Sequence, residues 1–231
     1  MRAGTGAGIV SALVIAAGAG LSAQSSGAAA RVAAAKAVAG DVRGARVLFE
    51  RLCVQPPAPR PPAPAGQPAA APRVPPRSEW YTEPAKVFDN LYFIGEKEYT
   101  SWAVTTSAGI IVIDPLFEYS VEDEVVNGLK ALGLDPSQIK YVLVSHAHRD
   151  HVAGARLLQE RFKARVVMSE ADWDLVATDP GRWPKPERDV VATDGYRLTL
   201  GDTTLTLHHT PGHTLGTIST IIPLRDGARR H

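Results

Sequence analysis

Four side chains that bind metal ions or transfer protons lie within the six residues His-Ala-His-Arg-Asp-His, from His146 to His151. Imidazole and carboxylate groups belong to the ligand set that zinc favours. His146 and His148 alternate with other residues, so on an extended backbone they project to the same side. Asp150 and His151 can then turn toward a second position nearby. The spacing predicts one loop that supplies ligands to two adjacent metal ions; a solvated polar loop is the alternative.

A second group of histidines, His208, His209 and His213, follows the alternating run Thr204 to Leu207. Pro211-Gly212 marks a turn that would present His213 from the end of a strand. Histidines distant in sequence commonly complete a zinc site, so we predict that His213 joins the first group. His208 and His209 are expected to be surface or packed imidazoles, because one of two neighbours on a strand points away.

Apolar runs and turn residues predict the elements that would position these histidines. Alternating strands and helices imply a parallel sheet with crossover helices, and ligand sites favour the carboxyl edge of such a sheet. The buried strand Tyr141 to Val144 places the first motif at that edge. The other expected strands are Val87 to Ile94, Ser101 to Thr106, Ile110 to Ile113, Arg165 to Met168, Tyr196 to Leu200, Thr203 to His208 and Gly216 to Ile222. One expected helix begins at a capping box at Ser120 and ends at Gly133. Further helices are expected from Val152 to Phe162 and from Ser169 to Val176.

The first 77 residues differ in composition from the rest of the chain. Residues 1–23 resemble a secretory signal peptide, because Arg2 precedes an apolar stretch, Ile9 to Leu21, that is short for a membrane span. An uncleaved anchor is the alternative. Residues 24–77 form an Ala/Pro-rich N-terminal segment and linker. We therefore expect a periplasmic or secreted protein with no stable membrane span after signal cleavage, and a folded domain at residues 78–231.

Overall composition limits the possible partners. The 231 residues, 45% of them hydrophobic, are enough for one domain with a sizeable core. A net charge of +1 gives no sign of a nucleic-acid partner. Cys53 is the only cysteine in the sequence, which excludes an internal disulfide. The composition does not indicate an oligomeric state.

From about Trp80 onward the chain resembles the metallo-β-lactamase superfamily. The resemblance rests on the strand ending Ile113-Asp114, the HxHxDH motif at residues 146–151 and Thr210-Pro211-Gly212-His213. Within the superfamily it looks most like the third subclass of class B β-lactamases, which have histidine at the position of His151. The resemblance implies an α/β fold, the metallo-β-lactamase αββα sandwich, and we expect its C-terminal part to be missing here.

The resemblance also implies the metal ligands and their cofactor. One Zn²⁺ would be held by His146, His148 and His213. A second Zn²⁺ would be held partly by Asp150 and His151. The cofactor would thus be up to two zinc ions, with the second site incomplete.

The function implied by the resemblance is zinc-dependent hydrolysis of a small-molecule substrate, the amide in a β-lactam ring, and with it antibiotic resistance. Zinc lowers the pKa of bound water to about 7, which supplies metal-bound hydroxide at neutral pH. Asp150 would be the catalytic residue that also binds metal and orients the nucleophile. Asp114 would orient ligands or loops, or else simply end its strand before Pro115. The alternatives are a lactonase or thioesterase on the same scaffold, or a catalytically silent zinc-binding fragment.

The end of the sequence departs from the family's pattern. The family's second zinc takes a further histidine from well downstream of the motif that contains His213. This sequence ends at His231, which we do not assign as a ligand. We therefore expect a fragment that binds the second zinc weakly and exposes apolar sheet surface.

Overall fold

The computed structural model describes residues 74–231 continuously and, before them, residues 30, 32–37, 39–40, 46 and 49. The chain divides into two compact units, Met1–Ala71 and Pro72–His231. In the first unit, residues 32–37 are helical. The predicted signal peptide and most of the predicted N-terminal segment and linker lie outside the described residues. Among the described helices, none combines the length and the hydropathy needed to cross a membrane.

The second unit is built on a seven-stranded sheet whose strands follow chain order from β1 to β7. Strands β1 to β4 pair antiparallel and strands β4 to β7 pair parallel, as expected for strands linked by crossover helices. The strands are β1 (Ala85–Phe88), β2 (Leu91–Phe93), β3 (Trp102–Thr106), β4 (Gly109–Ile113), β5 (Ile139–Leu143), β6 (Arg165–Ser169) and β7 (Val190–Ala192).

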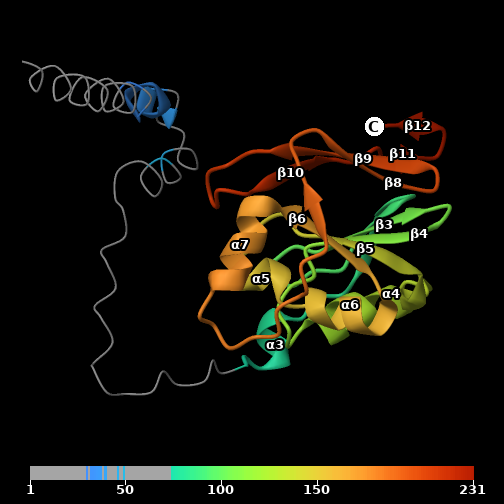
Figure 1. The fold of residues 1–231 in the computed structure, drawn as a ribbon. Helices are drawn as coiled ribbons and strands as arrows, with labels where there is room; N and C mark the ends of the chain where they lie inside the picture. The colour runs from blue at the N-terminus through green and yellow to red at the C-terminus, as the bar shows by residue number, and fades with distance from the viewer. Residues whose placement is uncertain (1–29, 31, 38, 41–45, 47–48, 50–73) are drawn as a thin grey trace, which may run out of the picture. The chain divides into compact units, whose positions relative to one another are not determined.

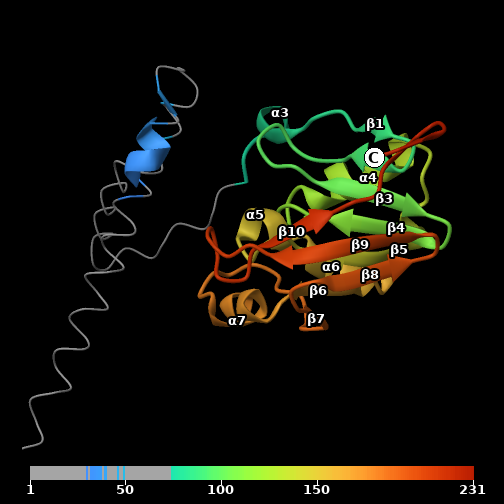
Figure 2. The same ribbon diagram turned by 90° about the horizontal axis from the view of Figure 1, so that it is seen from above.

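Helices cover one face of this sheet and a second sheet covers the other, which gives a layered sandwich (Figure 1). The helical elements are α3 (Arg77–Trp80), η2 (Glu122–Val126), α4 (Asn127–Ala131), η3 (Pro136–Gln138), α5 (Arg149–Val152), α6 (Ala155–Phe162) and α7 (Glu170–Thr178). The second sheet contains β8 (Tyr196–Leu200), β9 (Thr203–His209) and β10 (Ile218–Ile221), and a small hairpin joins β11 (Arg225–Asp226) to β12 (Arg229–Arg230). Figure 2 shows β8, β9 and β10 lying across the larger sheet.

The period-two alternation of the strands divides the apolar core into two layers. On β4, Ile110 and Val112 face the helices, whereas Ile111 and Ile113 face the second sheet. Leu205 and Leu207 of β9 are fully buried in this inter-sheet layer. The prediction of an α/β sandwich with a parallel layer is therefore confirmed.

The outward face of the second sheet is mostly polar. Its exposed or half-buried side chains are Arg197, Thr199, Thr204, Thr206, His208, Ser219 and Ile221. Ile221, 61% exposed, is the apolar exception. The prediction of an exposed apolar sheet surface is thus wrong for this face, because threonines alternate with the buried leucines.

Three predicted elements differ from the structure. The expected strand Val87 to Ile94 is a hairpin, because the buried Asn90 side chain turns the chain and hydrogen-bonds the backbone of Pro223 and Arg225. The helix expected from Val152 to Phe162 begins instead at Ala155. The residue before it, Gly154, lies against the Pro115 carbonyl, where no Cβ would fit. The capping box at Ser120 does not form, because its hydroxyl donates to the Phe117 carbonyl instead.

Glu124 is a fully buried acid on η2. Its Oε1 accepts a hydrogen bond from the backbone N–H of Thr82 at 3.0 Å, and its Oε2 has no partner among the described residues. Burial raises the pKa of Glu124 to about 7. Between pH 4.5 and 7 the folded protein therefore holds this proton more tightly than the unfolded chain, and stability falls as pH rises through that window.

We accordingly expect Glu124→Gln to raise the free energy of unfolding at pH 8 by about 2 kcal/mol. At pH 4 the substitution should change little, because the native carboxyl is then protonated in both states. Denaturant unfolding of both proteins at both pH values measures the difference. A stabilisation of equal size at pH 4 and pH 8 would contradict the argument.

Candidate metal centre

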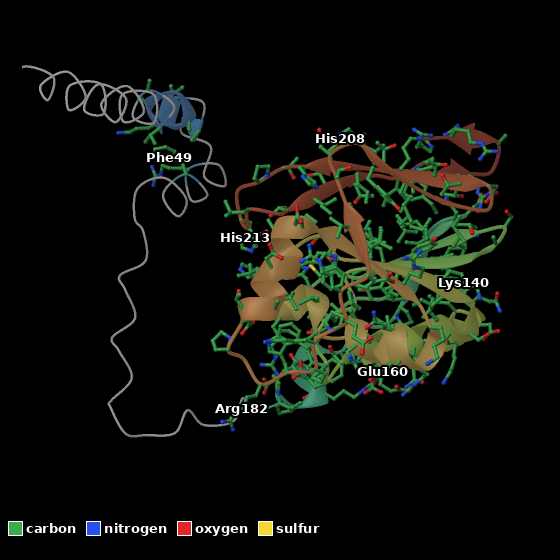
Figure 3. The ribbon with its side chains drawn as sticks, viewed as in Figure 1. Phe49, Lys140, Glu160, Arg182, His208 and His213 are labelled. Carbon is green, nitrogen blue, oxygen red and sulfur yellow. The ribbon has the colours of Figure 1, made fainter. Side chains whose placement is uncertain are left out.

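The predicted ligand residues come from two connections at one edge of the sandwich. His146 and His148 follow β5, and Asp150 and His151 lie in the short helix α5 that begins directly afterwards. His213 lies in the loop between β9 and β10. Figure 3 shows His213 beside the helix layer, and His208 on the outer side of the second sheet. The first motif thus lies at the carboxyl end of a parallel strand, as predicted.

Three histidines meet at this edge. One ring nitrogen each of His146, His148 and His213 lie within 4.8 Å of one another. Nδ1 of His148 is 2.9 Å from Nε2 of His213. Tetrahedral zinc with bonds of about 2.0 Å to nitrogen would hold its ligand atoms about 3.3 Å apart. The donor set and its spacing therefore suit a metal ion, with only small side-chain movements needed.

Asp150 and His151 lie beside this cluster and face one another. Oδ2 of Asp150 is 3.2 Å from Nε2 of His151. The ring centroids of His146 and His151 are 4.1 Å apart. The two facing atoms, a carboxylate oxygen and an imidazole nitrogen, are ligand types that a second cation could bridge.

Asp114 holds His151 from the opposite side. Its Oδ2 accepts a hydrogen bond from His151 Nδ1 at 2.9 Å and from the Ser145 hydroxyl at 2.7 Å. Its Oδ1 accepts from the Ser145 backbone N–H at 2.6 Å. Asp114 has a positive φ of 56° and is 7% exposed. A carboxylate in this position orients the ring, so that Nε2 points toward Asp150.

The pKa values of the neighbouring histidines His146 and His151 are shifted in opposite directions. Burial, and then the neighbouring His151, lowers the pKa of His146 to about 4, which keeps its imidazole neutral. The pKa of His151 is raised to about 9: burial opposes the charge, but the hydrogen bonds to Asp114 and Asp150 outweigh it. Despite burial, the bond to His151 lowers the pKa of Asp150. The metal-free protein therefore has a neutral His146 beside the ion pair of Asp150 and His151.

The remaining histidines lie away from the cluster. His208 is on the outer face of β9, with Nδ1 3.7 Å from an Asp194 carboxylate oxygen. Nε2 of His209 lies 3.0 Å from the Ala192 carbonyl. The His231 ring is 5.9 Å from the ring of Phe88. Cys53 lies outside the described residues.

Asp172 is a residue near the site that the sequence analysis missed. This side chain on α7 is 1% exposed, and its Oδ2 accepts from the Ala147 backbone N–H at 3.1 Å and from the Thr214 hydroxyl at 2.9 Å. Ala147 lies between two of the clustered histidines, and Thr214 follows the third. Asp172 therefore ties together the two loops that carry the cluster, although nothing in its local sequence signals this.

We expect Asp172→Ala to weaken metal binding by about 10–100-fold, because the two loops lose their shared acceptor. Asp174→Ala, on the exposed side of the same helix, where Asp174 binds Arg188, is the matched control. Titration of each protein with zinc against a chromophoric chelator measures the affinity. Equal affinities for the two variants would show that Asp172 does not position the loops.

A family model and curated relatives match much of the second unit. The family model of the metallo-beta-lactamase superfamily matches residues 94–227. Hydroxyacylglutathione hydrolases of Mesorhizobium japonicum and Acidiphilium cryptum are 32% and 28% identical over 50% and 52% of this chain. The chain spans 43% and 42% of those relatives' lengths, respectively.

Solved structures with the same fold include two metallo-beta-lactamases. The native enzyme from Legionella gormanii is 32% identical with a TM-score of 0.61, over 65% of this chain and 61% of the enzyme. A subclass B3 enzyme of Bradyrhizobium japonicum is 31% identical with a TM-score of 0.60, over 64% of this chain and 60% of that enzyme. The fold is therefore shared with enzymes that this chain covers in part.

Proposed function

The chain belongs to the metallo-beta-lactamase superfamily, and on that premise we propose that it is a zinc-dependent hydrolase that opens the amide of a β-lactam ring. The observation that carries the proposal is the three-histidine cluster with Asp150 and His151 beside it. Likeness to subclass B3 enzymes at about 30% identity supports the choice of a β-lactam substrate. An exported protein, periplasmic or secreted, fits the same proposal.

Each residue of the centre has a distinct role in this proposal. His146, His148 and His213 hold one zinc ion, while Asp150 and His151 supply part of a second site. Zinc, when bound, supplies a Lewis acid and a water of lowered pKa.

Asp150 accepts a hydrogen bond from the attacking water and aims its lone pair at the substrate carbonyl. Asp114 holds the His151 ring so that Nε2 points toward Asp150, where it would act as a ligand to the second zinc. No serine or cysteine nucleophile is required by this chemistry.

A thioesterase is the second candidate, because the curated relatives named above are hydroxyacylglutathione hydrolases. The same ligand set would also serve hydrolysis of a thioester carbonyl. A lactonase and a metal-binding protein without hydrolytic activity remain as outcomes of the test.

The test is turnover of a chromogenic cephalosporin beside a lactone and S-lactoylglutathione, with and without chelator. We expect cephalosporin hydrolysis that is lost with chelator and restored by added zinc. Turnover that survives metal removal would reject the zinc mechanism. Thioester turnover alone would favour the second candidate, and zinc uptake without any turnover would support a catalytically silent protein.

A further inference from the structure

A cavity of about 290 Å³ with an aromatic wall lies next to the candidate metal centre. Four rings line it: Trp80 from α3, Tyr99 from the loop after β2, and Phe117 and Tyr119 from the loop after β4. Phe117 and Tyr119 are stacked with centroids 4.8 Å apart. Tyr99 meets Phe117 edge-on at 5.3 Å, and Trp80 meets Tyr119 at 5.7 Å. The contacts join the four rings into one continuous surface.

The same cavity is acidic. Glu79, Glu96 and Glu98 line it, and none of its lining residues is a lysine or arginine. The neighbouring Lys97 instead donates its ammonium to the Ser78 carbonyl at 2.6 Å. The cavity thus presents three carboxyl groups with no basic side chain among the residues that form it.

Glu96 is the residue that points to a ligand. It is 3% exposed, and its Oε1 has no hydrogen-bond partner among the described residues. Its position is set by a tight turn, in which its backbone N–H donates to the Tyr99 carbonyl at 2.7 Å. Burial raises the pKa of this carboxyl. Ser120 hydrogen-bonds this carboxyl, but the buried Oε1 remains without a partner among the described residues. A buried polar oxygen without a partner is costly, and a cation in the cavity would offset that cost.

Tyr99 connects the cavity to the metal centre. One side of its ring contacts Phe117 in the cavity wall, and the ring also lies edge-on to His151, with centroids 6.2 Å apart. The cavity and the metal centre therefore lie on either side of this one ring, so a substrate held at the metal centre would have to pass the edge of Tyr99 to place a substituent in the cavity.

We propose that this cavity binds an organic cation, either a quaternary or a protonated amine. Aromatic faces and a carboxylate together recognise such groups through cation–π and charge interactions. A metal ion would need several converging oxygen ligands, whereas Glu96 is the one buried acid in the lining. That the cation is a substituent of the substrate rests on the proposed hydrolase function; the binding itself does not.

Choline and its uncharged isostere 3,3-dimethyl-1-butanol form a matched pair of probes. We expect calorimetric titration of the whole chain to show choline binding about 10-fold more tightly. Glu96→Gln should remove most of that preference. Glu160→Gln, an exposed glutamate on α6 that is labelled in Figure 3, should leave it unchanged.

Two further measurements distinguish loss of the cation site from loss of the fold. Glu96→Gln should melt at the same temperature as the native protein or higher, because glutamine carries no buried charge. Tyr119→Leu should weaken choline binding while leaving Glu96 in place. Equal affinity of the native protein for the two probes, or choline binding that survives Glu96→Gln, would overturn the proposal. These titrations require no turnover, so a failure of the hydrolase proposal would leave their result standing.

Discussion

His213→Ala is expected to lower kcat/KM for the hydrolysed substrate by about 10³-fold or more, because the first metal position loses one of its three histidines. His213 is exposed and its nearest interaction at the site is the 2.9 Å approach to His148. The fold should therefore tolerate the change. Steady-state kinetics and zinc content by mass spectrometry measure the two effects together.

The control for this variant is His208→Ala, which removes an imidazole from the outer face of the second sheet. It should retain the activity and zinc content of the native protein. Thermal melts without metal should coincide for all three proteins. Native-like zinc content and turnover in His213→Ala would show that His213 is not a ligand.

Asp150→Asn is expected to lower kcat/KM by about 10²–10³-fold, because the amide is a weak ligand and carries no charge to orient water. The variant should also lose metal from the second position, while the three-histidine cluster keeps its own. Zinc content per chain and cephalosporin kinetics test both statements. Asp174→Asn, an exposed carboxylate on α7, is the matched control.

Asp150→Asn should also change the pKa of His151. Two carboxylates raise the pKa of His151, and Asp150 is one of them. In metal-free Asp150→Asn that pKa should fall toward its ordinary value, as followed by NMR of the ring protons. An unchanged His151 titration together with full activity would contradict the proposed role.

Local sequence was enough to predict the first motif and the strand before it. A run of apolar residues followed by His146 and His148 indicates a strand end whatever the rest of the chain does. The turn at Asn90 was missed, because its cause is a hydrogen bond to backbone near residue 223, far along the chain. Strand β7 was missed because three residues after a proline-rich loop carry little periodicity.

The candidate site shows the same division between local and distant causes. His213 was predicted from its turn and from the first motif, and the structure brings it to the cluster. Asp172 could not be predicted, because its role depends on which loops cross the end of α7. Glu96 reads as a surface charge in a polar turn, and only the packing of four rings shows that it is buried.

The long separation between the two halves of the cluster has a consequence for how the protein matures. His148 and His213 are 65 residues apart in the chain, whereas Asp150 and His151 are adjacent. Contacts with high sequence separation form late, because the intervening loop must close first. A nascent chain therefore presents a weak, local chelating motif long before the tight one exists. Full metal affinity arises only when both sheets have docked, so metal capture reports that folding is complete.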